Sequence, residues 1–256
     1  EEEYVSLAVE LAEDLHRLAE LRNTLRERMR NSPLFDGEGW TRAFERLIQK
    51  TVFGSRDNQL STEQILERAI FYHSQGKVAY AESLYQVILE TDPEHSLANH
   101  NLGVVALGRD DKEKAIEYFE KALLVNPQFP VACVNMANTL KDLGRLGEAR
   151  DYYQRALEMW PDSAETYNNL GIVLENLGDP EGAINSYQSA VQIYPNFVQA
   201  LNNLGNLLQY SGRLEEAEEK FQKALQNNPE VVDIHLNLAR TLHEKGEFEE
   251  AKKSAQ

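Results

Sequence analysis

The chain has 256 residues and an excess of acid, with 42 Asp and Glu against 26 Lys and Arg. Nucleic acid and anionic membrane surfaces are bound through clustered Lys and Arg, so this balance argues against both as partners. Residues 1–50 carry 11 acids and 8 bases, so most of the net charge of −16 lies on the later part of the chain. That charge either keeps an elongated protein soluble or favours a basic partner, and both readings stay open.

The single cysteine, Cys133, excludes an intramolecular disulfide and fits a reducing compartment such as the cytoplasm. We expect it to be a buried, small apolar residue. No apolar run approaches the length of a membrane span. The chain opens on Glu1 without a methionine and stops inside a repeat, so we expect it to be a piece of a longer protein.

Residues 1–52 contain two apolar stripes at helical spacing, so we expect them to form helices. The first stripe is Leu15, Leu18, Leu21, Leu25 and Met29, and the second is Trp40, Phe44, Leu47, Ile48 and Val52. Between the stripes, residues 32–37 read Ser-Pro-Leu-Phe-Asp-Gly, which cannot be helical throughout. Residues 53–60 follow as a polar linker.

The segment that carries Leu-Arg at 21–22, Leu-Arg-Glu-Arg-Met at 25–29 and Ser-Pro-Leu-Phe-Asp at 32–36 resembles a known family. It is similar to the carboxyl end of the catalytic domain in O-GlcNAc transferase and SPINDLY-type glycosyltransferases. The alternative is a generic helical cap on the repeats that follow. The resemblance implies a UDP-sugar site elsewhere, because the family's catalytic core is a pair of nucleotide-binding lobes. This segment is too short to build them, so no catalytic residue is assigned to this chain.

Residues 61–256 repeat with a period of 34 residues. Prolines recur at Pro93, Pro127, Pro161, Pro195 and Pro229. Alanines recur at Ala81, Ala115, Ala149, Ala183, Ala217 and Ala251, and an aromatic residue follows most of them after four positions. Between successive prolines lie two apolar helical stripes, joined by a turn at a glycine such as Gly76. One such hairpin cannot bury its apolar face alone, so neighbouring hairpins must stack.

These residues resemble the tetratricopeptide repeat, a helix–turn–helix unit of this length. The resemblance predicts an all-α fold, a right-handed superhelical solenoid preceded by an N-terminal helical segment. We expect five full repeats, at 62–95, 96–129, 130–163, 164–197 and 198–231, and a partial repeat from Val232. Ser61 and Gln64 match a capping box that opens the first helix.

Asparagine recurs at one position of the first helix of each repeat after the first. The column is Asn101, Asn135, Asn169, Asn203 and Asn237, and further asparagines lie beside it at Asn138, Asn168, Asn202 and Asn206. In this fold the first helices line the concave groove, so these nine residues are the candidate peptide-binding site. The resemblance to O-GlcNAc transferases implies that such a ladder grips the backbone of an extended polypeptide. The alternative is a repeat consensus that only bonds neighbouring helices.

Other chemistry is sparse. The six histidines show no spacing typical of metal ligands, and no nucleophile motif organises the Ser, His and Asp residues, so we expect no metal, no cofactor and no enzyme activity. A cluster of bases that clamps a carboxyl terminus also looks absent, because the assignable concave positions hold only Lys141 and Arg240.

The leading hypothesis is an interaction module that binds an extended protein or peptide, one candidate being a basic segment, and that delivers it to a glycosyltransferase. The first alternative is a fragment of an O-GlcNAc transferase-like enzyme whose catalytic lobes are absent from this chain. A second alternative is a structural scaffold that self-associates through its ends. The sequence leaves the oligomeric state open.

Overall fold

The computed structural model describes residues 61–254, which form twelve α-helices and no strand within that range. In chain order the helices are α4 (Thr62–Ser74), α5 (Val78–Thr91), α6 (Ser96–Leu107), α7 (Lys112–Val125), α8 (Pro130–Asp142), α9 (Leu146–Met159), α10 (Ala164–Asn176), α11 (Pro180–Ile193), α12 (Val198–Tyr210), α13 (Leu214–Asn227), α14 (Val232–Glu244) and α15 (Phe248–Ser254). The predicted all-α class is confirmed for this part of the chain. The expected N-terminal helical segment and linker lie outside the described residues.

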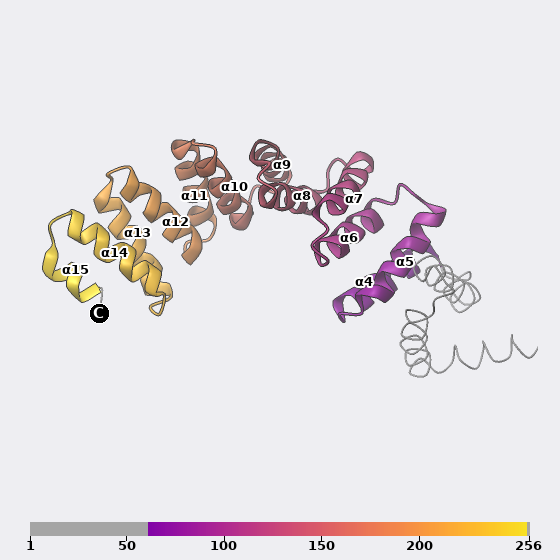
Figure 1. The fold of residues 1–256 in the computed structure, drawn as a ribbon, viewed down its shortest axis with the longest axis horizontal. Coiled ribbons are helices and arrows are strands. Elements are labelled where there is room, and N and C mark those ends of the chain that lie inside the picture. Colours follow the sequence, from indigo (N-terminus) through magenta and orange to yellow (C-terminus); the bar gives the residue numbers. More distant parts are fainter. Residues whose placement is uncertain (1–60, 255–256) are drawn as a thin grey trace, which may run out of the picture. The chain divides into compact units, whose positions relative to one another are not determined.

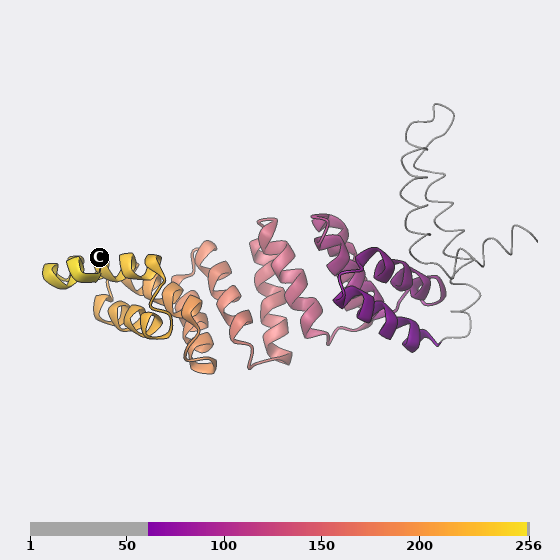
Figure 2. The ribbon, with the colours of Figure 1, turned by 90° about the horizontal axis from the view of Figure 1, so that it is seen from below.

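The helices belong to two compact units, with α4 and α5 in the first and α6 to α15 in the second. In the second unit each first helix packs against the second helix of its own repeat, as α6 does on α7. Each second helix also packs against the first helix of the next repeat, as α7 does on α8. Figures 1 and 2 show these hairpins stacked in sequence order from α6 to α15. Such nearest-neighbour packing produces one continuous core along a solenoid.

A tight turn joins the two helices of each repeat. One residue of this turn must adopt the left-handed backbone conformation, with a positive φ. Glycine supplies it at five turns, with φ between +72° and +85°, at Gly76, Gly144, Gly178, Gly212 and Gly246. Asp110 takes the same place in the second repeat with φ +59°. Aspartate is one of the few other residues that tolerate this region, at a cost of about 1 kcal/mol. The departure from glycine in the sequence is therefore accommodated without a change of turn.

The first and second helices of a hairpin approach closely because a small residue faces an aromatic ring. The rings of Phe119, Tyr187 and Phe221 are fully buried. A Cβ built on Gly103, Gly171 or Gly205 would lie only 2.5–2.6 Å from the nearest ring atom. The repeated alanines on the second helices, such as Ala115 and Ala183, are also fully buried. Small residues on both helices therefore set the hairpin spacing, and the ring fills what remains.

The ends of the helices follow the repeat as well. Ser61 accepts a hydrogen bond from the Gln64 backbone N–H, and the Gln64 side chain accepts one from the Ser61 N–H, which confirms the predicted capping box. The second helices end two residues before each repeated proline, as α7 ends at Val125 before Pro127. Proline cannot continue the hydrogen-bond ladder, so it fixes that boundary.

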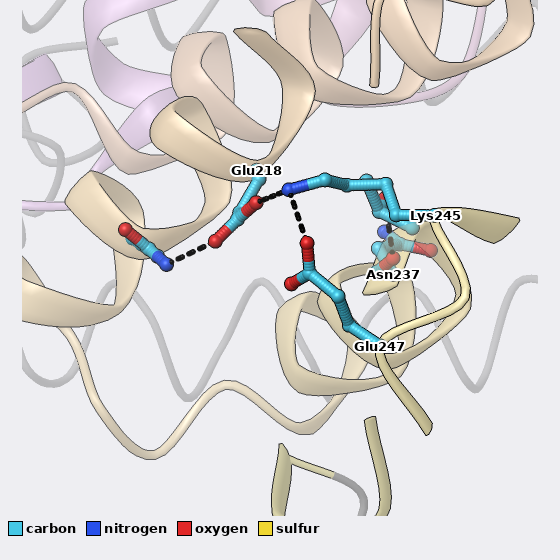
Figure 3. Close-up of polar contacts among 6 residues, drawn as sticks. Glu218, Asn237, Lys245 and Glu247 are labelled. Carbon is cyan, nitrogen blue, oxygen red and sulfur yellow. Dashed lines mark hydrogen bonds and ion pairs between the residues drawn. The ribbon is translucent and has the colours of Figure 1, made fainter. Parts of the chain in front are cut away.

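Lys245, in the last turn, ties α13 to the hairpin of α14 and α15 (Figure 3). Its Nζ lies 2.5 Å from Glu218 Oε2 and 2.9 Å from Glu247 Oε1. Hydrogen bonding to Glu218 is the main cause that raises the pKa of Lys245, and hydrogen bonding to Glu247 adds to it. Part of the negative charge of α13 is therefore neutralised by ion pairing within the chain.

Replacing Gly171 by alanine should destabilise the chain by about 1–3 kcal/mol, because the new methyl group must displace the buried Tyr187 ring. The matched control is Gly147→Ala in α9, where an added Cβ meets nothing within 4 Å. That change should leave the stability unchanged or raise it by at most about 1 kcal/mol. Thermal unfolding of both variants measures the difference. Equal effects at the two glycines would show that ring contact does not set the hairpin spacing.

Candidate functional site

The second unit forms an arc whose inner side is lined by first helices (Figure 1). We define the inner face as the side of α6, α8, α10, α12 and α14 that looks into this arc. These helices approach one another directly, since α8 contacts α10, α10 contacts α12 and α12 contacts α14. Side chains along those seams can therefore reach from one repeat to the next.

The asparagine column runs along these seams. All five members of the column are half-buried, and each stands two positions before a glycine or alanine of its first helix, as Asn101 does before Gly103. The four later members each donate an Nδ2–H bond to the preceding repeat. The column is therefore a ladder of inter-repeat hydrogen bonds, as the consensus alternative expects. Binding of a ligand by the same residues stays a prediction.

Three rungs share one geometry, in which the acceptor lies 35 residues earlier in the chain. Asn203 donates to Asn168 Oδ1 at 3.1 Å, and Asn237 donates to Asn202 Oδ1 at 3.1 Å. Asn135 Nδ2 lies 3.0 Å from His100 Nε2, which stands at the same repeat position as Asn168 and Asn202. Two of the additional candidate asparagines, Asn168 and Asn202, thus serve as acceptors within the ladder.

The hydrogen bond of Asn169 departs from this geometry because the residue 35 positions earlier cannot accept it. The residue 35 positions before Asn169 is Val134, whose side chain cannot accept a hydrogen bond. Asn169 donates instead to Asn138 Oδ1 at 3.4 Å, and the Tyr153 hydroxyl donates to the same oxygen. Burial of Tyr153 raises the pKa of its hydroxyl, which keeps that donor protonated.

The ladder is polarised, which means that every hydrogen bond in it runs from an Nδ2 donor to an acceptor in the preceding repeat. Since Nδ2 is the donor at every rung, the Oδ1 atoms of Asn135, Asn169 and Asn203 are left over. Within the described residues these three oxygens have no hydrogen-bond partner, and none of them is buried. The last member differs, because Asn237 Oδ1 accepts from Arg240 Nη2 at 3.2 Å. The inner face therefore presents three fixed acceptors, one from each of three consecutive repeats.

Two predicted residues lack a place in the ladder. Asn206 Oδ1 is buried without a partner among the described residues. The residue 15 positions later is Phe221, whereas the equivalent partner of Asn138 is Tyr153, so the hydroxyl donor is missing. Asn101 Nδ2 is also buried and has no acceptor in the described part of the chain.

His100 is a member of this site that was not predicted from the sequence. Its ring is 7% exposed and lies against Phe129 and Phe119, with centroid distances of 4.8 and 5.7 Å. Its Nδ1 atom is buried and has no partner among the residues that the structure describes. Burial lowers the pKa of His100 below its ordinary value. The sequence signal that could have identified His100 is its repeat position, which asparagine occupies in two later repeats.

The inner face carries little charge. Its helices hold two bases, Lys141 and Arg240, and five acids, which are Asp142, Glu165, Glu175, Asp233 and Glu244. By contrast α13 alone holds four glutamates, at Glu215, Glu216, Glu218 and Glu219. Residues 61–254 contain no cluster of metal-ligating side chains and no helix long and apolar enough to cross a membrane. Neutral amides are therefore the dominant polar groups of this face.

Replacing His100 by asparagine should reduce the loss of stability on acidification. The folded state lowers the pKa of His100, so the unfolded chain takes up a proton more readily as pH falls below the usual histidine value of about 6.5. Stability is thus complete above that value and declines below it. Between about pH 7 and pH 5, the melting temperature of the wild type should fall further than that of H100N.

The matched control removes the exposed His243, and H243N is measured at the same pH values as H100N. Parallel pH profiles for the wild type and H100N would contradict the assignment of this acid sensitivity to His100.

Models of the tetratricopeptide repeat family match residues 96–129, 130–196, 186–219 and 208–255. Among solved structures, MamA has a TM-score of 0.60 at 24% identity, covering 63% of this chain and 94% of that one. The protein in "Functional Characterization of Pseudomonas Aeruginosa pilF" has a TM-score of 0.65 at 19% identity, covering 76% of this chain and 86% of that one. YrrB, described as "a TPR protein with an unusual peptide-binding site", has a TM-score of 0.60 at 24% identity, covering 66% of this chain and 88% of that one. These likenesses establish the fold alone.

Among curated proteins, the chain is 58% identical over 45 residues to the "Probable UDP-N-acetylglucosamine--peptide N-acetylglucosaminyltransferase SPINDLY" of Hordeum vulgare. That match covers 18% of this chain and 5% of the barley protein. The chain is also 34% identical over 88 residues to the photosystem I assembly protein Ycf3 of Rippkaea orientalis, covering 30% of this chain and 51% of that protein. The matches thus cover about half of one relative and a twentieth of the other, while the resemblance to SPINDLY-type proteins is confirmed. Together with the stacked hairpins, the four model matches show that the chain belongs to the tetratricopeptide repeat family.

Proposed function

We propose that the chain is a binding module, not an enzyme, and that its inner face holds an extended polypeptide. The observation that carries this proposal is the polarised ladder. Asn135, Asn169 and Asn203 each offer an open Oδ1 acceptor, held in place by a bond from the same amide to the preceding repeat. A backbone N–H is the donor that every residue except proline supplies. These acceptors would therefore contact an extended chain at intervals without reading its sequence.

The fixed geometry favours binding because little side-chain freedom remains to be lost. An asparagine on an open surface must be ordered when it meets a ligand, which opposes association. In the ladder that ordering has already occurred on folding. The low charge of the inner face supports a largely neutral contact region, and a basic segment would find few carboxylates along it.

Recruitment of the bound polypeptide to a glycosyltransferase is part of the proposal and rests on the 45-residue similarity to SPINDLY-type proteins. The runner-up is that the chain is a piece of such an enzyme. In both cases the inner face holds the substrate polypeptide, and the sugar chemistry belongs to other residues. We place the protein in a reducing compartment such as the cytoplasm, because Cys133 is its only cysteine and is free and buried.

The first experiment changes the ligand and leaves the protein intact. A library of short random peptides is displayed on phage and selected on the chain, and the best binder is synthesised. N-methylation of single backbone nitrogens then removes one donor at a time. Each methyl group on a nitrogen that meets an Oδ1 acceptor should weaken binding by about 0.5–1.5 kcal/mol, and methylation of the alternate nitrogens should matter less. A uniform response along the peptide would contradict backbone recognition by the ladder.

The second experiment changes the protein. Replacing Asn135, Asn169 and Asn203 together by alanine should weaken binding of the selected peptide about tenfold or more, since three modest hydrogen bonds are lost. The melting temperature should fall as well, because the same residues bond neighbouring repeats. Affinity is therefore measured well below that temperature. The control is Asn185→Ala on the outer helix α11, where the side chain is exposed. Lower stability with unchanged affinity per folded molecule would leave the ladder a purely structural role.

A further inference from the structure

The ladder begins with a hydrogen bond whose acceptor can take up a proton. Asn135 Nδ2 on α8 lies 3.0 Å from His100 Nε2 on α6. Asn203, by contrast, donates to the amide oxygen of Asn168. An amide oxygen remains an acceptor at any moderate pH, but an imidazole nitrogen accepts only while it carries no proton. The contact between α6 and α8 therefore depends on the charge of His100.

Neutral His100 carries its single proton on Nδ1, because Nε2 accepts from Asn135. That Nδ1 atom is buried and has no hydrogen-bond partner in residues 61–254. A second proton, taken up from solvent, must therefore go to Nε2, the nitrogen that faces Asn135. Two N–H donors would then point at each other, and the hydrogen bond would be lost.

A half-turn of the Asn135 amide restores this hydrogen bond. The oxygen and nitrogen of an amide are similar in size, so Oδ1 and Nδ2 can exchange places within one side chain. Oδ1 then accepts from the protonated Nε2 of His100. The exchange also changes the inner face, where the neutral state leaves Oδ1 of Asn135 open. A donor now stands where an acceptor stood.

We infer that His100 is a positioning residue, which decides whether Asn135 presents an acceptor or a donor to the bound polypeptide; this inference rests on the proposed function. While the ring is neutral, Asn135 accepts from a backbone N–H of the polypeptide. Once the ring is charged, that N–H meets another donor. Only the acceptors of Asn169 and Asn203 then remain open, so the polypeptide is bound less tightly in acid.

The surroundings of His100 favour the neutral ring. Burial lowers its pKa, and within the described residues no charged group is a cause of that shift. The ring lies against Phe119 of α7 and Phe129 just before α8, and neither of them titrates. The loss of affinity should therefore occur below the ordinary histidine pKa of about 6.5.

The titratable groups near this contact lie on three helices. On α6 itself, the first turn is capped by His95, whose ring accepts from the Ala98 backbone N–H. Most titratable side chains of α7 and α8 are exposed, and those at least half-buried are Lys112, Tyr118, Cys133 and Lys141. None of these groups is a cause of the shift in the pKa of His100.

The probe is a peptide selected on the wild-type chain that lacks Asp, Glu and His and has both ends blocked, so its own charge is constant. Between about pH 7 and pH 5, its affinity for the wild type should fall about two- to tenfold, the worth of one hydrogen bond. In His100→Asn the acceptor is an amide oxygen, so the affinity at about pH 7 should be kept and the fall should disappear. His243→Asn, which replaces an exposed histidine, is the matched control.

A change in the ligand locates the effect. N-methylation of the peptide nitrogen that meets Asn135 should remove the fall, because the hydrogen bond that acid reverses is already absent. Nitrogen NMR of the imidazole gives the midpoint of the His100 titration, and the amide signals of Asn135 should shift with the same midpoint. Every affinity is measured well below the melting temperature of that variant at that pH.

A fall of equal size in the wild type and in His100→Asn would overturn this inference and leave the proposed function standing. So would a constant affinity while His100 takes up its proton, or a ring that stays neutral down to about pH 5. Loss of the fall in His243→Asn but not in His100→Asn would also overturn it. Failure of the peptide to bind the wild type at about pH 7 would overturn the inference and the proposed function together.

Discussion

The close approach of the two helices in each hairpin is the contact on which the rest of the second unit depends. A buried ring such as Tyr187 lies directly on a glycine of the facing helix, and a Cβ there would come within 2.5 Å of a ring atom. Interiors packed this tightly leave little room for adjustment, so the ring sets the hairpin spacing where a glycine faces it. Alanine takes the place of the glycine at Ala137 and Ala239, and the first helices still stack in the same order along the second unit. Only under that condition can residues 35 positions apart meet reliably.

The ladder on the inner face is the structural consequence of that regular stacking. An amide that bonds the preceding repeat through Nδ2 has its orientation fixed, and its oxygen is then directed elsewhere. The same side chain therefore contributes to cohesion between repeats and to a surface that can accept hydrogen bonds. Structural and binding roles of the asparagines, which the sequence presents as alternatives, are compatible in this geometry. The two ends of the ladder differ from its middle, with His100 at one end and Arg240 at the other.

Much of the fold follows from periodicity in the sequence. The proline and glycine positions predict the ends and turns of the helices, and the small and aromatic residues predict the faces that pack. Asp110 was recognisable as a substitute for glycine because it stands at the same position in the period. These features depend on neighbours within one hairpin, so local pattern is sufficient.

The hydrogen bonds of the inner face could not be predicted in the same way. Which atom meets Asn169 depends on whether the residue 35 positions earlier can accept a hydrogen bond, and Val134 cannot, so the bond shifts to Asn138. The orphaned oxygen of Asn206 depends on the absence of one hydroxyl from Phe221. Periodicity shows that a column of asparagines exists. Which hydrogen bonds form between repeats depends on whether each neighbouring side chain carries a donor or acceptor atom.

Side-chain amide NMR of the free and peptide-bound chain can show whether the asparagines bond the preceding repeat and meet the ligand at once. One Nδ2 proton of each of Asn169, Asn203 and Asn237 should exchange slowly with solvent in the free protein, because it bonds the preceding repeat. Addition of the selected peptide should shift the amide signals of Asn135, Asn169 and Asn203 while those inter-repeat protons stay protected. Rapid exchange of both Nδ2 protons in the free protein, or loss of protection when the peptide binds, would contradict a ladder that joins the repeats and presents its oxygens to the partner.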